Sequence, residues 1–192
     1  MSPIELLNRW LSEEEKAGAP NPHHAVLSTA TQGAVPHGRV VAIREVTEQG
    51  LLFFTQNGSR KVAELTENPK FSIVFWLELH LREIILEGSV EPLSAAENLQ
   101  YWETINRERQ LRFSSYAPIS SQPISSKEIL AERKKQFELQ HEGQPIPLSP
   151  YYCGFRLLPV RVMFYASRKD ELSDVMEYSK INGKWVSQLL SP

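Results

Sequence analysis

Ser59, Arg60 and Lys61 are the residues best suited to chemistry, and they follow the apolar run 51–56 and a turn at Gly58. This pattern predicts a strand, a tight turn and the first turn of a helix. Ser59 is a favourable N-cap residue, and the start of a helix leaves several backbone N–H groups without partners. These groups and the two cations predict a site for an anion, and a phosphate fits it best.

A solvated Arg60–Lys61 pair without a ligand is the alternative. The helix dipole mildly disfavours a cation in the first helical turn, so the pair needs a reason to stand there. On the residues of this segment alone, both interpretations stay open.

A third cation, Arg39, supports the anion site. Its strand is expected over 38–46 and joins the following strand by a hairpin turn. With the turn centred near Glu48, Arg39 lies opposite Gln56. Three cations and unpaired N–H groups at one turn favour the phosphate interpretation.

These segments resemble a known family. Their order and spacing, from about His24 to Pro192, are similar to those of the pyridoxamine 5′-phosphate oxidase family of FMN flavoproteins. The matching segments are Arg39-Val40-Val41, Phe53-Phe54-Thr55, Gly58-Ser59-Arg60-Lys61, Asn68-Pro69, Leu86-Glu87-Gly88, Tyr101, Ser120-Ser121, Gly154-Phe155-Arg156, Met163-Phe164-Tyr165 and the final Trp185 to Pro192. The resemblance covers nearly the whole chain but leaves the substrate open.

The resemblance implies a split β-barrel, usually a homodimer with FMN between the subunits, and it implies which residues bind the cofactor. The phosphate and ribityl chain would be held by Arg39, Ser59, Arg60 and Lys61. The flavin ring would lie against the backbone of Val40, Val41, Ala42 and Ile43 and against Phe54 and Thr55. Other parts of the dimeric site would come from Ser120, Ser121 and Tyr165. On the sequence alone, Tyr165 fits equally well as a core aromatic of its strand.

Several positions depart from the family pattern. Glu83, a candidate flavin contact, and Ile119 stand where the family has glutamines, and Tyr165 stands where it has a tryptophan. The segment 171–175 reads Glu-Leu-Ser-Asp-Val where the family has Arg-Leu-His-Asp-Arg. In the family, the first arginine and the histidine recognise pyridoxal phosphate, and the second arginine touches FMN.

The expected substrate positions are altered too. Arg44 replaces a lysine, Ile105 an arginine and Arg109 a serine, and only Tyr101 is kept. Arg44 and Arg109 could still bind an anionic substrate. Strict strand alternation puts Arg39 and Arg44 on opposite faces, so both can line one site only if a bulge or a subunit boundary lies between them.

Competing functions follow from these changes. The first is an FMN-dependent oxidase that transfers hydride from a small anionic or fused-ring substrate to flavin, which oxygen reoxidises. The second is a genuine pyridoxine/pyridoxamine 5′-phosphate oxidase with a rebuilt pocket. The third is a flavin- or phosphate-ligand-binding protein without turnover.

No dinucleotide-binding, P-loop or hydrolase motif is present, and nothing suggests a nucleophile. A flavin would supply its own redox chemistry.

The elements that must position these residues alternate short helices with many strands. Helices are expected from the capping boxes at Ser2 and Ser94, at 59–67 and at about 125–141, with an ordered loop or lid over Arg112–Pro123. Strands are expected over 25–31, 70–79, 81–90, 151–158 and 160–166, and as a final hairpin about Asn182-Gly183. The pattern predicts a mainly β chain with helices (α+β), folded as an antiparallel split β-barrel flanked by helices.

Length and composition narrow the class of protein. The 192 residues are 41% hydrophobic and favour one domain, 1–192, with an N-terminal helix in 1–20. The net charge of −2 argues against nucleic acid as the main partner. The single cysteine, Cys153, favours a buried spectator thiol and a reducing compartment. With no membrane-spanning run and no metal-ligand spacing among the histidines, a cytoplasmic protein without a metal is expected.

The same apolar strands predict a homodimer. The segments Phe71–Leu79 and Ile84–Leu86 carry more large side chains than one barrel interior and a few helices readily cover. The expected partners are therefore a second copy of the chain and a small-molecule substrate.

Overall fold

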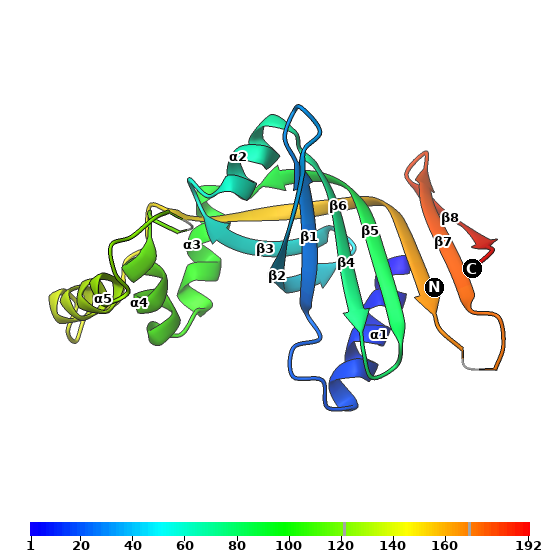
Figure 1. The fold of residues 1–192 in the computed structure, drawn as a ribbon, viewed down its shortest axis with the longest axis horizontal. Helices are drawn as coiled ribbons and strands as arrows, with labels where there is room; N and C mark the ends of the chain where they lie inside the picture. The colour runs from blue at the N-terminus through cyan, green and yellow to red at the C-terminus, as the bar shows by residue number, and fades with distance from the viewer. Residues whose placement is uncertain (121, 169) are drawn as a thin grey trace. The chain divides into compact units, whose positions relative to one another are not determined.

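The computed structural model describes residues 1–120, 122–168 and 170–192, and Figure 1 shows how their elements follow one another. Ser121, an expected FMN contact, lies outside the described residues. The described helices are α1 (Pro3–Lys16), α2 (Arg60–Glu67), α3 (Ala95–Thr104), α4 (Arg107–Tyr116) and α5 (Glu128–Gln140). The described strands are β1 (His24–Ala30), β2 (Pro36–Thr47), β3 (Gly50–Gln56), β4 (Lys70–Leu77), β5 (Arg82–Pro92), β6 (Tyr152–Ala166), β7 (Asp174–Ile181) and β8 (Lys184–Leu190).

The described strands form one sheet in the order β3-β2-β1-β4-β5-β6-β7-β8, and β3 also pairs with β6. The second pairing closes the first six strands of this order into an antiparallel barrel, while β7 and β8 extend beyond it. The expected neighbours β4 and β5 pair in register from Lys70–Ser89 to Leu77–Arg82. The predicted fold class, an antiparallel split barrel with helices, is confirmed.

The hairpin of β7 and β8 is confirmed at its expected turn. Asn182 and Gly183 have φ angles of 49° and 78°, the two positive values that a type I′ turn requires. β8 is the last strand of the described sheet, and Val186 and Leu189 on it are exposed.

The barrel interior is filled by alternate residues of its strands. On β4, Phe71, Ile73, Phe75 and Leu77 are buried and the residues between them are less so. Gly88 on β5 has no room for a side chain, because a Cβ there would lie 2.0 Å from the carbonyl oxygen of Leu158. A close approach of β5 and β6 therefore depends on this glycine.

The N-terminal helix packs on the barrel through one apolar face. Its capping box at Ser2 is formed as predicted. Trp10 makes an edge-to-face contact with Phe164, at 5.1 Å between ring centroids. Near the helix end, the buried Glu14 accepts from Leu79 N at 2.8 Å and lies 2.6 Å from His80 Nδ1. These contacts attach the end of α1 to the turn between β4 and β5.

The chain divides into two compact units. Unit 1 comprises 1–53, 64–91 and 155–192, and unit 2 comprises 54–63 and 92–154. Unit 1 holds most of the barrel with α1, and unit 2 holds α3, α4 and α5 with the turn before α2. The prediction of a single domain stays a prediction.

Two of the expected elements differ in the structure. Arg112–Pro123 was expected to be a loop or lid, but its part up to Tyr116 belongs to α4, because Asn106 caps this helix and Leu111 and Phe113 bury one face; the described residues of 117–123 are not helical. The two strands expected on either side of Pro159 are one strand, β6, of 15 residues.

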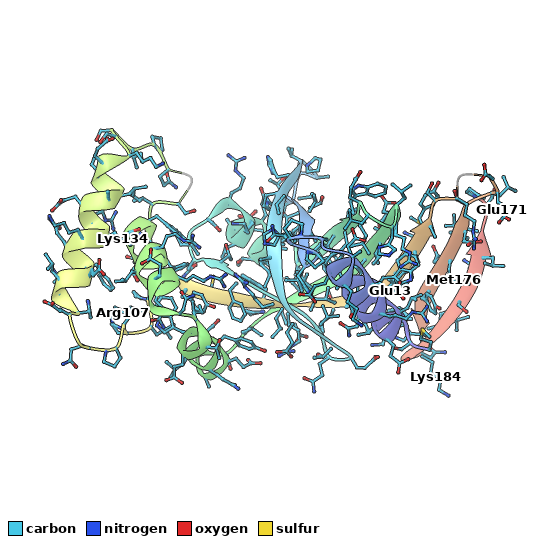
Figure 2. The ribbon with its side chains drawn as sticks, turned by 90° about the horizontal axis from the view of Figure 1, so that it is seen from below. Glu13, Arg107, Lys134, Glu171, Met176 and Lys184 are labelled. Atoms are coloured by element: carbon cyan, nitrogen blue, oxygen red, sulfur yellow. The ribbon has the colours of Figure 1, made fainter. Side chains whose placement is uncertain are left out.

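Helix α5 lies on the surface, since none of its described residues is buried. It begins after Lys127, which makes no side-chain cap. Figure 2 shows α5 beside α4, with Lys134 and Arg107 labelled; Lys134 pairs with Glu108 of α4 at 2.5 Å. Across the described ranges 1–120, 122–168 and 170–192, no helix has the length and apolar character needed to cross a membrane.

Candidate functional site

The predicted turn and helix start are present in unit 2. Gly58 has a φ of +86°, and Ser59 N donates to Gln56 O at 3.2 Å, which closes the turn. Ser59 is buried, and its carbonyl oxygen accepts from Val62 N and Ala63 N as α2 begins. Ser59 therefore holds the N-cap position that its sequence context predicts.

Lys61 brings three expected cofactor-binding residues together. Its Nζ donates to Thr55 Oγ1 at 3.0 Å and to Ser59 Oγ at 3.3 Å. The ammonium thus lies over the turn, on the side of the two hydroxyl groups. Arg60, the second expected cation, is exposed. A helix start with a lysine and two hydroxyls suits a phosphate.

Cys153 lies beside this group but has no reactive character. Its Sγ is 3.6 Å from the carbonyl oxygen of Thr55. Burial raises the pKa of the thiol to about 11, against the opposing charge of Lys61. A protonated thiol is a poor nucleophile, so the raised pKa argues against Cys153 as a nucleophile.

Gln56 is a polar residue that sequence reasoning did not single out as a site residue. It is 3% exposed, and neither atom of its amide has a hydrogen-bond partner among the described residues. Strand alternation places it on the face of β3 that carries Phe54 rather than the face that carries Thr55. Buried amides rarely stay unpaired. The only signal in the sequence was a glutamine at the end of an apolar run.

Phe54 belongs to an aromatic cluster of unit 2. Its ring stacks on Tyr152 at 5.2 Å and 8°, and contacts Tyr101 at 4.7 Å. Gly154 permits this packing, since a Cβ there would lie 2.5 Å from the Phe54 ring. Tyr101, the expected substrate residue that matches the family, is therefore joined to an expected flavin contact.

Arg39 lies in a buried network of unit 1. Its guanidinium donates to Thr29 Oγ1 at 2.5 Å, to Glu64 Oε2 at 3.2 Å and to Leu27 O at 3.4 Å. Thr29 Oγ1 also donates to Glu64 Oε2. Burial of Glu64 opposes its ionisation, but the hydrogen bonds from Thr29 and Arg39 and the nearby His37 together hold the pKa of this carboxyl below its usual value.

His37 completes the network. Its Nδ1 lies 2.7 Å from Glu64 Oε1, although the contact does not meet hydrogen-bond geometry. Neither Glu64 nor His37 was foreseen as a site residue.

The expected position of Arg39 opposite Gln56 is not part of the strand pairing. The β2–β3 ladder runs from Thr47–Gly50 to Ile43–Phe53, and Arg39 pairs with Leu27 of β1. The ladder shifts register at Arg44, which gives the bulge that the alternation argument required. Arg39 belongs to unit 1 and Lys61 to unit 2, so each group is described by itself.

The other expected cofactor residues lie on several elements. Val40 of β2 is 65% exposed, and its neighbours Val41 and Ala42 are half-buried. Glu83 of β5 is half-buried and pairs across strands with Trp76. Ser120 is half-buried in unit 2.

Side chains of the segment between β6 and β7 contact one another and the ends of these two strands. Tyr165 Oη donates to Ser173 Oγ at 2.9 Å. Arg168 donates to Asp174 from two nitrogens and lies 3.8 Å from Glu171, which Figure 2 labels in this segment. The hydrogen bonds of Asp174 raise the pKa of Arg168. The altered positions thus carry an internal ion-pair network.

The remaining expected substrate residues are in unit 2. Arg109 is exposed on α4, and its backbone N–H is held by the Asn106 cap. Ile105 packs against the aromatic core and lines a surface cavity of about 430 Å³, where Arg107 and Gln110 also lie. Among the described residues, no three His, Cys, Asp or Glu side chains gather as metal ligands would.

Comparisons with known proteins agree on one family. The model of the pyridoxamine 5′-phosphate oxidase family matches residues 11–138. A pyridoxine/pyridoxamine 5′-phosphate oxidase of Alteromonas mediterranea is 35% identical, over 100% of this chain and 90% of its own length. The enzyme of the same name from Nostoc punctiforme is 33% identical, over 100% and 89%.

Two solved structures are similar over the whole chain. PhzG of Burkholderia lata, determined in complex with tetrahydrophenazine-1-carboxylic acid, has a TM-score of 0.91 and 28% identity, over 100% of this chain and 93% of its own. A pyridoxamine 5′-phosphate oxidase-related, FMN-binding protein of Nostoc punctiforme has a TM-score of 0.82 and 17% identity, over 100% and 99%, and at that identity it supports the fold alone.

Proposed function

The chain belongs to the pyridoxamine 5′-phosphate oxidase family, and on that basis we propose that it is an FMN-dependent oxidase acting on a small anionic or fused-ring substrate other than the vitamin B6 phosphates. One observation carries the cofactor part of this proposal. Lys61, Ser59 and Thr55 present an ammonium and two hydroxyls at the start of α2, which fits a phosphate monoester.

The residues that would hold FMN fall into three groups. Lys61, Ser59 and Arg60 would bind the phosphate with the N–H groups of α2, and Arg39 would add a further cation. The backbone of 40–43 with Phe54 and Thr55 would support the ring. Glu83, Ser120 and Tyr165 remain proposed contacts from other segments.

FMN, when bound, would accept a hydride from a substrate carbon and pass two electrons to dioxygen, so that hydrogen peroxide forms and the oxidised substrate is released. The chain's own residues bind and orient the reactants. Tyr101, Arg44 and Arg109 are the proposed substrate residues. Arginines at two of these positions favour an anionic substrate.

The segment 165–174 supports a substrate without a phosphate at that end. Arg168 of this segment donates to Asp174 and lies near Glu171. Ser173 accepts from Tyr165. A phosphate dianion brought to Glu171 would meet repulsion instead of the family's arginine. The similarity to PhzG, whose structure contains a fused-ring monocarboxylate, favours such a substrate class.

Steady-state hydrogen peroxide production tests the proposal. We expect turnover with a reduced fused-ring carboxylate, and a kcat/KM for the two B6 phosphates about a thousandfold or more below that of an authentic oxidase assayed alongside, since a lost cation and an added carboxylate each cost a few kcal/mol. Turnover of neither substrate class by FMN-loaded protein would leave a flavin-binding protein without turnover.

A genuine pyridoxine/pyridoxamine 5′-phosphate oxidase is the second candidate. The names and full-length similarity of the relatives favour it. Arg44 and Arg109 could replace the lost phosphate contacts in a rebuilt pocket. A kcat/KM for the B6 phosphates within tenfold of the authentic enzyme would establish this alternative and overturn the first.

A homodimer in the cytoplasm completes the proposal. Val40, Val26, Val74 and Ile85 stand side by side across β2, β1, β4 and β5. Val40 is 65% and Val26 42% exposed, so this apolar row faces outward in the single chain. A second copy of the chain would cover this apolar row. The cytoplasm is proposed separately, because a single cysteine favours a reducing compartment.

A further inference from the structure

The guanidinium of Arg39 has two edges that can each grip an anion through two parallel N–H groups. Nη1 and Nη2 form the end edge, and Nε and Nη2 form the side edge. At the end edge, Nη1 donates to Thr29 Oγ1 at 2.5 Å and Nη2 donates to Glu64 Oε2 at 3.2 Å. Nη1 also reaches Leu27 O at 3.4 Å.

Thr29 and Glu64 act on the end edge as one unit. The hydroxyl of Thr29 accepts from Arg39 and donates to the carboxylate that accepts from the same guanidinium, which closes a ring of hydrogen bonds. Thr29 is 3% and Glu64 4% exposed, so strand β1 and helix α2 fix both groups firmly.

The side edge of Arg39 is left for another partner. The contacts of Arg39 within the described chain use both Nη1 hydrogens and one Nη2 hydrogen, but not Nε–H. The side chain keeps 21% exposure, so this edge is not sealed in the core. An anion with two oxygens matches Nε–H and the second Nη2–H.

We propose that Glu64 and Thr29 are positioning residues, which occupy the end edge of Arg39 and thereby direct its side edge to the phosphate of FMN. This inference rests on the proposed FMN function. It assigns to a buried carboxylate a role in binding an anion, which its charge alone would oppose.

Charge and position predict opposite results when Glu64 is replaced. If the charge of Glu64 determines the affinity, both Glu64→Ala and Glu64→Gln should tighten FMN binding, because Arg39 is no longer neutralised. If position decides, Glu64→Ala weakens binding, since the guanidinium loses its support. Glu64→Gln keeps an oxygen that accepts from Arg39 and Thr29, and it should bind FMN at least as well as the unchanged protein.

The experiment measures the dissociation constants of FMN and riboflavin by quenching of flavin fluorescence. We expect Glu64→Ala to weaken FMN by about tenfold and Thr29→Val by about three- to tenfold, as for a lost charge-assisted contact, with riboflavin unchanged. Glu64→Gln and Thr29→Ser should retain the FMN affinity. A loss restricted to the phosphate-bearing flavin is a result that general destabilisation would not give.

Glu14→Ala is the matched control. Glu14 is also a buried carboxylate of unit 1, 2% exposed and paired with a histidine, but it holds the β4–β5 turn. Glu14→Ala should lower the melting temperature, as should Glu64→Ala, and it should leave both flavin affinities unchanged. Equal or tighter FMN binding by both Glu64→Ala and Thr29→Val would overturn the positioning role.

Failure of the proposed function gives a different result. Unchanged protein that binds FMN no better than riboflavin would remove the phosphate site itself. Unchanged protein that prefers FMN, with that preference kept in Glu64→Ala and Thr29→Val, would remove only the positioning role.

Discussion

At the scale of single residues, the placement of Lys61 decides what the start of α2 can bind. Its ammonium touches Thr55 and Ser59, although a cation at a helix start works against the helix dipole. An incoming phosphate would reverse that disadvantage, since it interacts favourably with the ammonium and with the positive end of the helix dipole.

Lys61→Ala should therefore weaken FMN about tenfold or more and leave riboflavin nearly unchanged, as loss of one charge-assisted contact predicts. Titration of flavin fluorescence measures both affinities. Lys184→Ala, at the exposed start of β8 and labelled in Figure 2, is the control and should change neither. Unaltered FMN affinity in the Arg60→Ala, Lys61→Ala double variant would remove the phosphate assignment.

Cys153 allows a prediction about pH. Its pKa of about 11 in the folded chain exceeds the ordinary value of 9.0, so the folded state holds the proton more strongly than the unfolded state. The stabilisation is complete below pH 9 and is lost as the pH rises from about 9 to about 11. Urea unfolding across this range should show the unchanged protein losing stability relative to Cys153→Ser.

The same shift governs the reactivity of the thiol. At pH 8, a pKa raised by about two units lowers the thiolate fraction about a hundredfold, so iodoacetamide should modify Cys153 far more slowly in native protein than in urea. Equal rates in the two states would show that the thiol is not shielded.

At the scale of elements, Gly88 sets how closely β5 and β6 approach. Gly88→Ala would place a Cβ against the backbone oxygen of Leu158 and should lower the free energy of unfolding by about 3 kcal/mol or more. Gly33→Ala is the matched control, because the nearest atom to its Cβ would be Thr31 Oγ1 at an ordinary 3.7 Å. Similar stability of the two variants by urea unfolding would contradict the close approach.

Most elements could be predicted from local chemistry. The capping boxes at Ser2 and Ser94 and the Asn182-Gly183 turn act within a few residues, and all three are formed as expected. Helix α4 was missed because Arg107, Arg109 and Arg112 blur its apolar period, while its stability comes from burial of Leu111 and Phe113 against other segments.

The site was only partly predictable for the same reason. Ser59 and Lys61 are neighbours in sequence, so their meeting follows from one turn and one helix start. Glu64 and Thr29 reach Arg39 from different elements, and the sequence contains no local signal for such contacts. The β2–β3 pairing ends at Ile43–Phe53, before it reaches Arg39, and Arg39 pairs with β1 instead.

At the scale of the whole molecule, the reason first given for a homodimer holds in part. Phe71 and Leu86 are buried within the single chain and need no partner, but Trp76 of the same strands is 51% exposed. The outward row that includes Val26 and Val40 supplies a better reason, because neighbouring strands bring these side chains into register. A stable interface over it should bury on the order of 2,000 Å².

Val26→Lys should then weaken dimerisation by about a hundredfold or more, since a lysine in an apolar interface is buried without a partner. Sedimentation velocity at micromolar concentration measures the change. Ile181→Lys, at an exposed apolar position beside the β7–β8 turn, is the control and should stay dimeric. A monomeric unchanged protein with FMN present would contradict the homodimer.

The position of β8 at the end of the described sheet bears on aggregation. As the last strand of the described sheet, it offers a row of backbone donors and acceptors along its open side. Lys184 is its single charged residue, and it has no proline, so it lacks the usual protection against adding another chain. Exposed Val186 and Leu189 make such addition more favourable. A second chain or segment that paired with this side of β8 would therefore also oppose aggregation.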